Sequence, residues 1–116
     1  MLLRTASPIY EPAGESKMVG QAYIEALEGA PDAPALRALH VKFVDGAHTR
    51  WHAHTGEQIL LVVEGKGFVE FRGGPTIEIH PSDRVFIPRF VSHRHGALKG
   101  ESMVHLAIST GDTQWE

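Results

Sequence analysis

Two histidines separated by one residue, His52 and His54, stand shortly before a glutamine, Gln58. In an extended strand, residues two apart point to the same face, so both imidazole rings can reach one metal ion. Gln58 keeps the same parity and can return to that face once the chain turns at residues 55–56. Glu57, whose carboxylate is the more obvious ligand, has the opposite parity and is expected to point outward. The pattern therefore predicts a metal site on a strand and the turn that follows it.

The elements that must position these residues are strands. From residue 36 onward, short apolar stretches alternate with Gly, Pro and Asp, which is typical of an all-β sandwich or barrel. The expected strands cover residues 39–44, 49–54, 59–63, 68–72, 76–80, 85–88, 92–96 and 103–109. Residues 64–67 and 73–75 are expected to form turns, the first of them a hairpin. About eight such strands favour a small single-domain barrel or jelly roll, because closure removes exposed strand edges.

The segment before residue 36 has no comparable pattern. Residues 1–35 are expected to form a short irregular N-terminal arm, and residues 36–116 the barrel. Within the arm, residues 21–27 fit either a strand or a short helix, and residues 28–34 form a loop by composition. A chain of 116 residues is one domain overall, since two halves would each be too small for a core.

Charge and composition argue against several classes of protein. A net charge of −3 gives no electrostatic basis for binding nucleic acid or an anionic membrane. No apolar run approaches the roughly 20 residues that span a bilayer. Residues 1–4 lack a basic segment followed by a long apolar one, so we expect no signal peptide. The absence of cysteine excludes disulfides and thiolate zinc modules. These features lead us to expect a soluble cytoplasmic protein.

The histidine motif is flanked by glycines, and a second group of residues that follows it along the chain belongs with it. The first block contains Gly46, His52, His54, Gln58 and Gly65, and the second contains Pro88 and His93. Together they resemble the paired motifs of the cupin superfamily, with Gln58 at the position usually held by glutamate. The second block departs from the family pattern at Ser82, Phe90 and Ala97.

The resemblance covers about residues 36–109. It is strongest to the small bacterial single-domain cupins, some related to carboxymuconolactone decarboxylase-associated cupins and to manganese-dependent hydroxynitrile lyases. It implies a conserved-barrel fold in which the metal ligands are His52, His54, Gln58 and His93.

Parity along the strand also predicts which way two further histidines point. His95 lies two residues after His93 and shares its face if the strand is regular. His105 has the parity opposite to Val104, Leu106 and Ile108, which places it on the cavity side, although a buried histidine bonded to a carbonyl fits equally well. Both could carry protons to or from a bound substrate. In the lyase-like cupins a hydroxyl beside the metal matches Thr49, a weaker candidate for orienting substrate. The other three are expected at the surface or in turns: His40, His48 and His80.

The predicted ligand set has an unusual charge. Three neutral imidazoles and a neutral amide leave the charge of a divalent ion uncompensated, which favours anionic or polarised oxygen ligands. Nitrogen and amide oxygen donors suit manganese, iron, nickel, cobalt or zinc. Four protein ligands would leave one or two positions for water or substrate. The cavity walls are expected to be apolar, drawn in some combination from Leu39, Val41, Trp51, Leu60 and Phe86.

Two functions remain open at this stage. The first is an enzyme that uses the metal as a Lewis acid on a small oxygenated organic molecule, in lyase, isomerase, decarboxylase-type or dioxygenase chemistry. The second is a non-catalytic module that binds or senses a small molecule. The spare histidines His95 and His105 favour the enzyme, since a binding protein needs no proton carriers. A homodimer is expected, as the commonest symmetric assembly.

Overall fold

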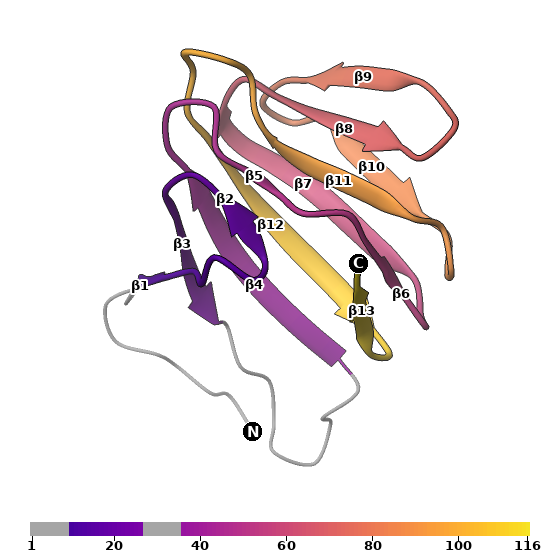
Figure 1. Ribbon diagram of the computed structural model, residues 1–116. Helices are drawn as coiled ribbons and strands as arrows, with labels where there is room; N and C mark the ends of the chain where they lie inside the picture. Colours follow the sequence, from indigo (N-terminus) through magenta and orange to yellow (C-terminus); the bar gives the residue numbers. More distant parts are fainter. Residues whose placement is uncertain (1–9, 27–35) are drawn as a thin grey trace, which may run out of the picture.

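The computed structural model describes residues 10–26 and 36–116, and every regular element in these two ranges is a strand (Figure 1). The strands are β1 (Glu11–Pro12), β2 (Met18–Val19), β3 (Ala22–Ala26), β4 (Leu36–Phe43), β5 (His48–Thr49), β6 (His52–His54), β7 (Gln58–Gly65), β8 (Gly67–Phe71), β9 (Thr76–Ile79), β10 (Arg84–Ile87), β11 (His93–Ala97), β12 (Met103–Thr110) and β13 (Thr113–Trp115). No helix able to cross a membrane occurs in the described part of the chain.

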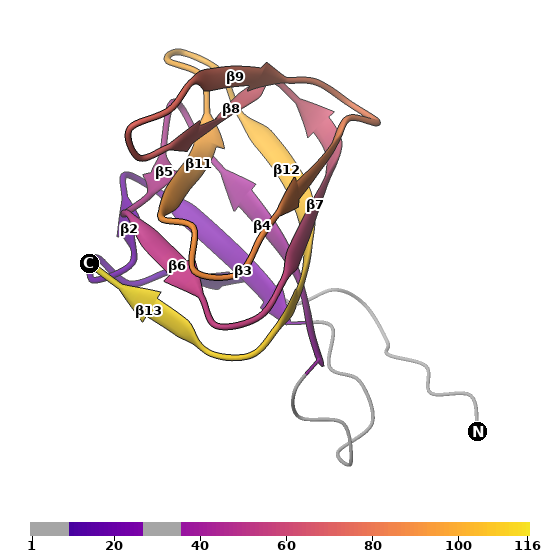
Figure 2. The same cartoon turned by 90° about the vertical axis from the view of Figure 1, so that its right-hand side faces the viewer.

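The strands form two antiparallel sheets that curl around a common axis (Figure 2). The first sheet has the order β1-β3-β4-β12-β7-β10. The second has the order β13-β6-β11-β5-β2, and β8 pairs with both β11 and β9. This arrangement confirms the all-β jelly-roll barrel that the spacing of the strands predicted. It also brings β6 and β7, which carry the His52–Gln58 motif, onto opposite walls.

Alternation along β12 from His105 onward shows how the sequence builds the interior. His105, Ala107 and Ser109 are buried, whereas Ile108 is exposed. Because β12 pairs with both β4 and β7, its inward side chains sit at the centre of the first sheet. Phe43 and Met103 lie opposite each other at one end of this sheet and are fully buried, so the apolar core closes that end of the barrel. The polar inward residues lie toward the other end.

Two connections differ from the prediction. Residues 49–54 are not one strand: β5 ends at Thr49 and β6 begins at His52. Residues 64–67 do not form a hairpin, because β7 belongs to the first sheet and β8 to the second, so the chain crosses between sheets there. Gly65 permits this crossing: its φ is +85°, and a Cβ would lie 1.9 Å from the carbonyl oxygen of Ser102. The expected turn at residues 73–75 does join the β8–β9 hairpin.

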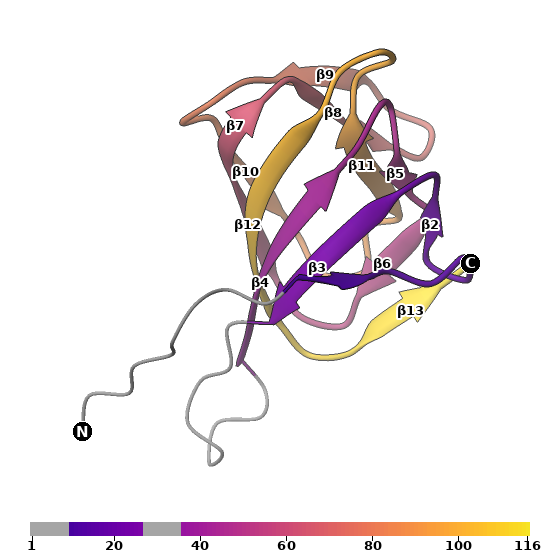
Figure 3. The ribbon, with the colours of Figure 1, turned by 90° about the vertical axis from the view of Figure 1, so that its left-hand side faces the viewer.

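The described part of the predicted N-terminal arm consists of strands (Figure 3). Residues 22–26 take the strand alternative and pair along β4, from Ala22 opposite Phe43 to Ala26 opposite Leu39. Strands β1 to β3 therefore pair with one another or with strands of the barrel, β3 with β4 and β2 with β5. The loop expected at residues 28–34 lies outside the described residues.

Candidate metal centre

Strand alternation delivers the first three predicted ligands to the interior. His52 and His54, on β6, are 2% and 4% exposed, and Gln58, the first residue of β7, is 5% exposed. Glu57 is exposed, as its parity predicted. His93 begins β11 directly opposite His52, with the two ring centroids 4.3 Å apart. The structure thus brings all four predicted ligands together.

The Gln58 side chain is the meeting point of this group. Its Oε1 lies 3.1 Å from His54 Nε2 and 3.2 Å from His93 Nε2. Its Nε2 donates to Ser109 Oγ at 2.8 Å, which orients the amide oxygen toward the histidines. The glutamine therefore presents an oxygen donor to the cavity.

In each of the three predicted ligand histidines, Nδ1 has a hydrogen-bond partner. His52 Nδ1–H donates to the Arg50 carbonyl at 2.8 Å, and His93 Nδ1–H donates to the Val91 carbonyl at 2.9 Å. Since a carbonyl can only accept, Nδ1 carries the proton in both rings, and Nε2 presents its lone pair to the cavity. His54 Nδ1 is hydrogen-bonded to Thr113 Oγ1 at 3.0 Å. Such partners fix the tautomer and ring orientation of metal-binding histidines.

These contacts test whether a metal ion fits. The lone pairs of His93 Nε2 and Gln58 Oε1 face each other at 3.2 Å, which is repulsive unless a cation lies between them. Donor atoms about 3 Å apart are what two adjacent ligands of one ion require when each bond is about 2.1 Å. The donor set therefore fits a divalent metal ion held by His52, His54, Gln58 and His93.

His95 and His105 form a buried pair next to these ligands. His95 Nδ1 and His105 Nε2 are hydrogen-bonded at 3.0 Å, so His105 bonds to another imidazole. In the described part of the chain, the outer nitrogens of the pair, His95 Nε2 and His105 Nδ1, have no partner. His95 is also close to the ligands, because one ring nitrogen each of His52, His93 and His95 lie within 4.8 Å of one another. A cation at the centre is therefore within reach of His95 as well.

All of these histidines are uncharged at neutral pH. Burial, and then the neighbouring His93, lower the pKa of His52 to about 3. Burial also lowers the pKa of His54 and of His105 to about 4. Burial, and then His105, place the pKa of His95 well below its ordinary value. Neutral imidazole is the form that binds metal or accepts a proton.

A cavity of about 220 Å³ adjoins the site. Leu39 and Val41 line it as predicted. The other three candidates do not line it: Leu60 is buried in the core, Phe86 is 55% exposed, and Trp51 is not among the lining residues. Trp51 lies outside the barrel, packed between the guanidinium groups of Arg72 and Arg94. Its place is taken by a tryptophan that we did not anticipate, Trp115, whose ring centroid is 4.4 Å from that of His52.

The remaining predicted residues have simpler roles. Thr49 is buried beside the cavity, and its Oγ1 accepts a hydrogen bond from the backbone N–H of His95 at 3.1 Å. His40 is half-buried beside Glu25, His48 is half-buried, and His80 is exposed, so all three lie outside the cavity.

Sequence reasoning missed Arg37, Thr113 and Trp115 at the site. The only available signal was the alternation of Thr113 and Trp115 after the turn at residues 111–112.

Comparisons with known proteins agree with this architecture. The family model described as a Cupin domain matches residues 39–109. An (R)-mandelonitrile lyase from Granulicella tundricola is 40% identical over 89 residues, covering 77% of this chain and 68% of the lyase. A crystal structure of a cupin-like protein from Thermotoga maritima superposes with a TM-score of 0.86 at 35% identity, covering 90% of this chain and 83% of that chain.

A more distant structure supports the fold alone. A predicted oxalate decarboxylase from Thermotoga maritima is 20% identical with a TM-score of 0.81, covering 97% of this chain and 100% of that chain. The matched domain, the relatives and the barrel with its inward histidines agree: the protein belongs to the cupin family.

Proposed function

We propose that this cupin is a metal-dependent enzyme that acts on a small oxygenated organic molecule. The observation that carries the proposal is the convergence of anchored imidazoles and one amide oxygen beside a buried histidine pair. Lyase chemistry is the first candidate, supported by the relative named as a mandelonitrile lyase. Isomerase, decarboxylase-type and dioxygenase reactions use the same kind of site and are the alternatives within this proposal.

One divalent transition metal would be held by His52, His54, Gln58 and His93. Nitrogen and amide oxygen donors suit Mn, Fe, Ni, Co or Zn. When bound, such an ion polarises a carbonyl or hydroxyl oxygen of the substrate as a Lewis acid. Because all four protein donors are neutral, they would leave the charge of the ion available to an anionic or partly charged oxygen.

The histidine pair supplies the proton chemistry. His95 Nε2 has no partner among the described residues, so it can accept a proton from a substrate at the metal. The charge that it gains is shared with His105 through the 3.0 Å hydrogen bond. Thr49 supports this step indirectly, since its hydroxyl holds the backbone of His95 and thereby fixes where the imidazole lies. We assign Thr49 a positioning role.

The alternative is a cupin that binds or senses a small molecule without turning it over. The same metal donors would serve that purpose, but a buried pair of histidines would then have no use. Burying the pair also costs free energy even when both rings are neutral, because His95 Nε2 and His105 Nδ1 have no hydrogen-bond partner among the described residues. We therefore favour the enzyme.

Metal analysis combined with turnover assays tests the proposal. Purified protein, with and without chelator treatment, is assayed for metal by mass spectrometry and for cleavage of hydroxynitriles and decarboxylation or oxidation of small hydroxy acids. We expect bound metal and a chelator-sensitive activity that His95→Gln abolishes while the metal content is kept. Metal binding without turnover of any of these compounds would favour the binding module. Failure to bind Mn, Fe, Ni, Co or Zn when each is added would overturn the enzyme and favour a metal-free binding module.

The expected homodimer has a candidate surface on the outer face of the first sheet. Phe86, Ile59 and Ile108 lie side by side on β10, β7 and β12 and are 55%, 45% and 39% exposed. An exposed apolar row of this kind is typical of an interface. We propose that two copies pair through it. Light scattering should give a dimer for the wild type and for Ile77→Glu, an equally exposed residue of β9, and a monomer for Ile59→Glu. A dimeric Ile59→Glu variant would contradict this interface.

A further inference from the structure

The charges that line the cavity are all of one sign. Among the described residues that line it, Lys17 and Arg37 carry permanent positive charges, and none is an aspartate or glutamate. The histidines beside them are neutral at pH 7, as shown above. A divalent ion at the predicted site would add further positive charge. The cavity therefore offers an anion several favourable partners and no repulsive one.

Arg37 lies in the same row of the first sheet as the predicted ligand Gln58. On the inner face, Arg37 of β4 is opposite Ser109 of β12, and Ser109 is opposite Gln58 of β7. Thr113 links it to the predicted ligands, because Thr113 Oγ1 lies 3.5 Å from an Arg37 Nη and 3.0 Å from His54 Nδ1. The guanidinium group therefore lies at the wall of the cavity nearest the ligands.

Some N–H groups of the Arg37 guanidinium make no hydrogen bond to the described residues. It donates to the Gly111 carbonyl and, at 3.5 Å, to Thr113 Oγ1. Two of its five N–H groups are used in this way, which leaves three. No carboxylate among the described residues pairs with it. A half-buried arginine without a carboxylate partner is suited to binding one from a ligand in a bidentate manner.

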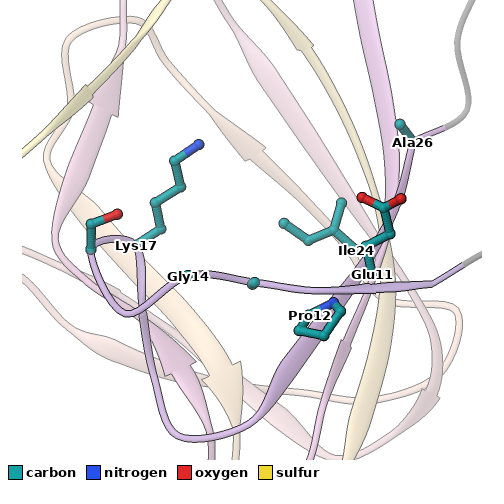
Figure 4. Close-up of a pocket in the computed structure, with 8 residues that line it drawn as sticks. Glu11, Pro12, Gly14, Lys17, Ile24 and Ala26 are labelled. Atoms are coloured by element: carbon teal, nitrogen blue, oxygen red, sulfur yellow. The ribbon is translucent and has the colours of Figure 1, made fainter.

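Lys17 adds a second cation at the entrance. Its Nζ lies 5.9 Å from the centroid of the Trp115 ring. Lys17 and Ile24 line both the cavity and an outer groove bounded by β1 and β3, so the two spaces are neighbours there. Figure 4 shows the Lys17 side chain reaching away from the strand that carries Glu11, the acidic residue of the groove. An anion that enters along this groove would meet Lys17 before it reaches Arg37.

We propose that the substrate carries a carboxylate, and that Arg37 binds this group while a neighbouring oxygen of the substrate faces the histidine and glutamine donors. This inference rests on the proposed function and specifies the substrate class. The cavity volume of about 220 Å³ equals about seven water molecules at roughly 30 Å³ each, which limits the substrate to a small acid. A 2-hydroxy or 2-oxo acid of a few carbon atoms has the required pair of oxygens at adjacent carbons. Leu39 and Val41 would contact its apolar part.

The test compares two ligands of equal size that differ in charge. Lactate and lactamide have the same number of non-hydrogen atoms, but only lactate carries a carboxylate. Binding to the manganese-loaded protein is measured by calorimetry and by tryptophan fluorescence, to which Trp115 beside the cavity contributes. We expect lactate to bind roughly 10- to 100-fold more tightly than lactamide, the range for a charge-assisted bidentate pair. Glycolate and pyruvate are measured alongside it as further 2-oxygenated acids.

Variants assign the effect to Arg37. In Arg37→Gln, lactate affinity should fall to that of lactamide, and Arg37→Lys should restore it only in part because an ammonium lacks the planar fork. Arg84→Gln, an exposed arginine on β10 outside the cavity, removes the same charge and should change nothing. Circular dichroism and metal content show whether each variant is folded and loaded. If Arg37→Gln does not fold, the comparison of lactate with lactamide in the wild type and in Arg37→Lys still tests whether Arg37 binds the carboxylate.

The outcomes separate this inference from the function on which it rests. A protein that takes up no metal contradicts the proposed function. A protein that binds metal yet binds lactamide as tightly as lactate, or keeps full lactate affinity in Arg37→Gln, overturns the carboxylate proposal alone. Failure of lactate, glycolate and pyruvate to bind to the metal-loaded protein below about 10 mM, about 2.7 kcal/mol of binding free energy, overturns it as well.

Discussion

Replacing Gln58 by glutamate tests whether the neutral donor set is what lets the site hold an anion. The change keeps the size of the side chain and places a negative charge where Oε1 now lies, 3.1 Å from His54 Nε2. The hydrogen bond to Ser109 survives with its direction reversed, because a hydroxyl can donate as well as accept. The variant should therefore fold when it is loaded with metal, because the ion compensates a carboxylate that would be costly to bury alone.

The size of the effect follows from Coulomb's law. A ligand oxygen at a neighbouring position on the ion would lie about 4 Å from the new carboxylate. Two unit charges at that distance repel by about 4 kcal/mol at an effective dielectric constant of about 20. Solvent in the open part of the cavity reduces this repulsion, so we expect about 1–3 kcal/mol, or roughly a 5- to 150-fold loss of affinity for an anion. The metal itself should bind more tightly, since its charge is now partly neutralised.

Formate is a suitable probe because it is the smallest carboxylate. Calorimetric titration of formate into manganese-loaded Gln58→Glu should show the weakened affinity, while competition with a chelator shows the tighter metal binding. Gln114→Glu is the matched control, since it makes the same exchange at an exposed position of β13 and should leave both affinities unchanged. Equal or tighter binding of formate by Gln58→Glu would refute the argument that the neutral amide selects for anions.

Three further predictions concern the support of the site. Thr113→Val removes the partner of His54 Nδ1 and should weaken metal binding about tenfold in a chelator competition; an unchanged affinity would contradict this role. Because the pKa values of His52 and His54 are lowered to about 3 and 4, both gain protons on unfolding below about pH 6.5. Urea unfolding of the metal-free protein should therefore show stability falling from pH 7 to 4, by about 1.4 kcal/mol per pH unit for each proton gained, rather than a flat profile. Gly96→Ala puts a Cβ 2.4 Å from the backbone of β5 and should cost about 2 kcal/mol or more in thermal unfolding, whereas Gly14→Ala, with no atom closer than 3.9 Å, should cost little.

The convergence of the four predicted ligands could be predicted from the sequence because their positions follow largely from a local rule. The period of two along a strand places His52 and His54 on one face, and the same parity separates Gln58 from Glu57. The rule needs no knowledge of which strand lies next to which. It holds here even though the predicted strand at residues 49–54 is divided, because the division falls before His52.

The walls of the cavity could not be predicted in the same way. Val85, Phe86 and Ile87 are all apolar, so the sequence does not show which of them faces inward, and the structure exposes the bulkiest. Trp51 precedes the inward His52, and its ring lies on the outside between two arginines. Arg37 reaches the site because β4 pairs with β12, at a separation of 72 residues for Arg37 and Ser109. Such pairing is set by tertiary packing, which no local pattern records.

The residues that would hold a metal and those that would choose the substrate come from different parts of the chain. His52, His54, Gln58 and His93 lie within the matched cupin segment, residues 39–109. The cations and the tryptophan of the cavity lie outside it, before residue 39 or after residue 109: Lys17, Arg37 and Trp115. Strand β13 joins the two sets, because Thr113 contacts both His54 and Arg37. A change in these flanking strands could therefore alter which acid is bound while the donor atoms stay in place, so relatives that share the metal ligands need not share a substrate.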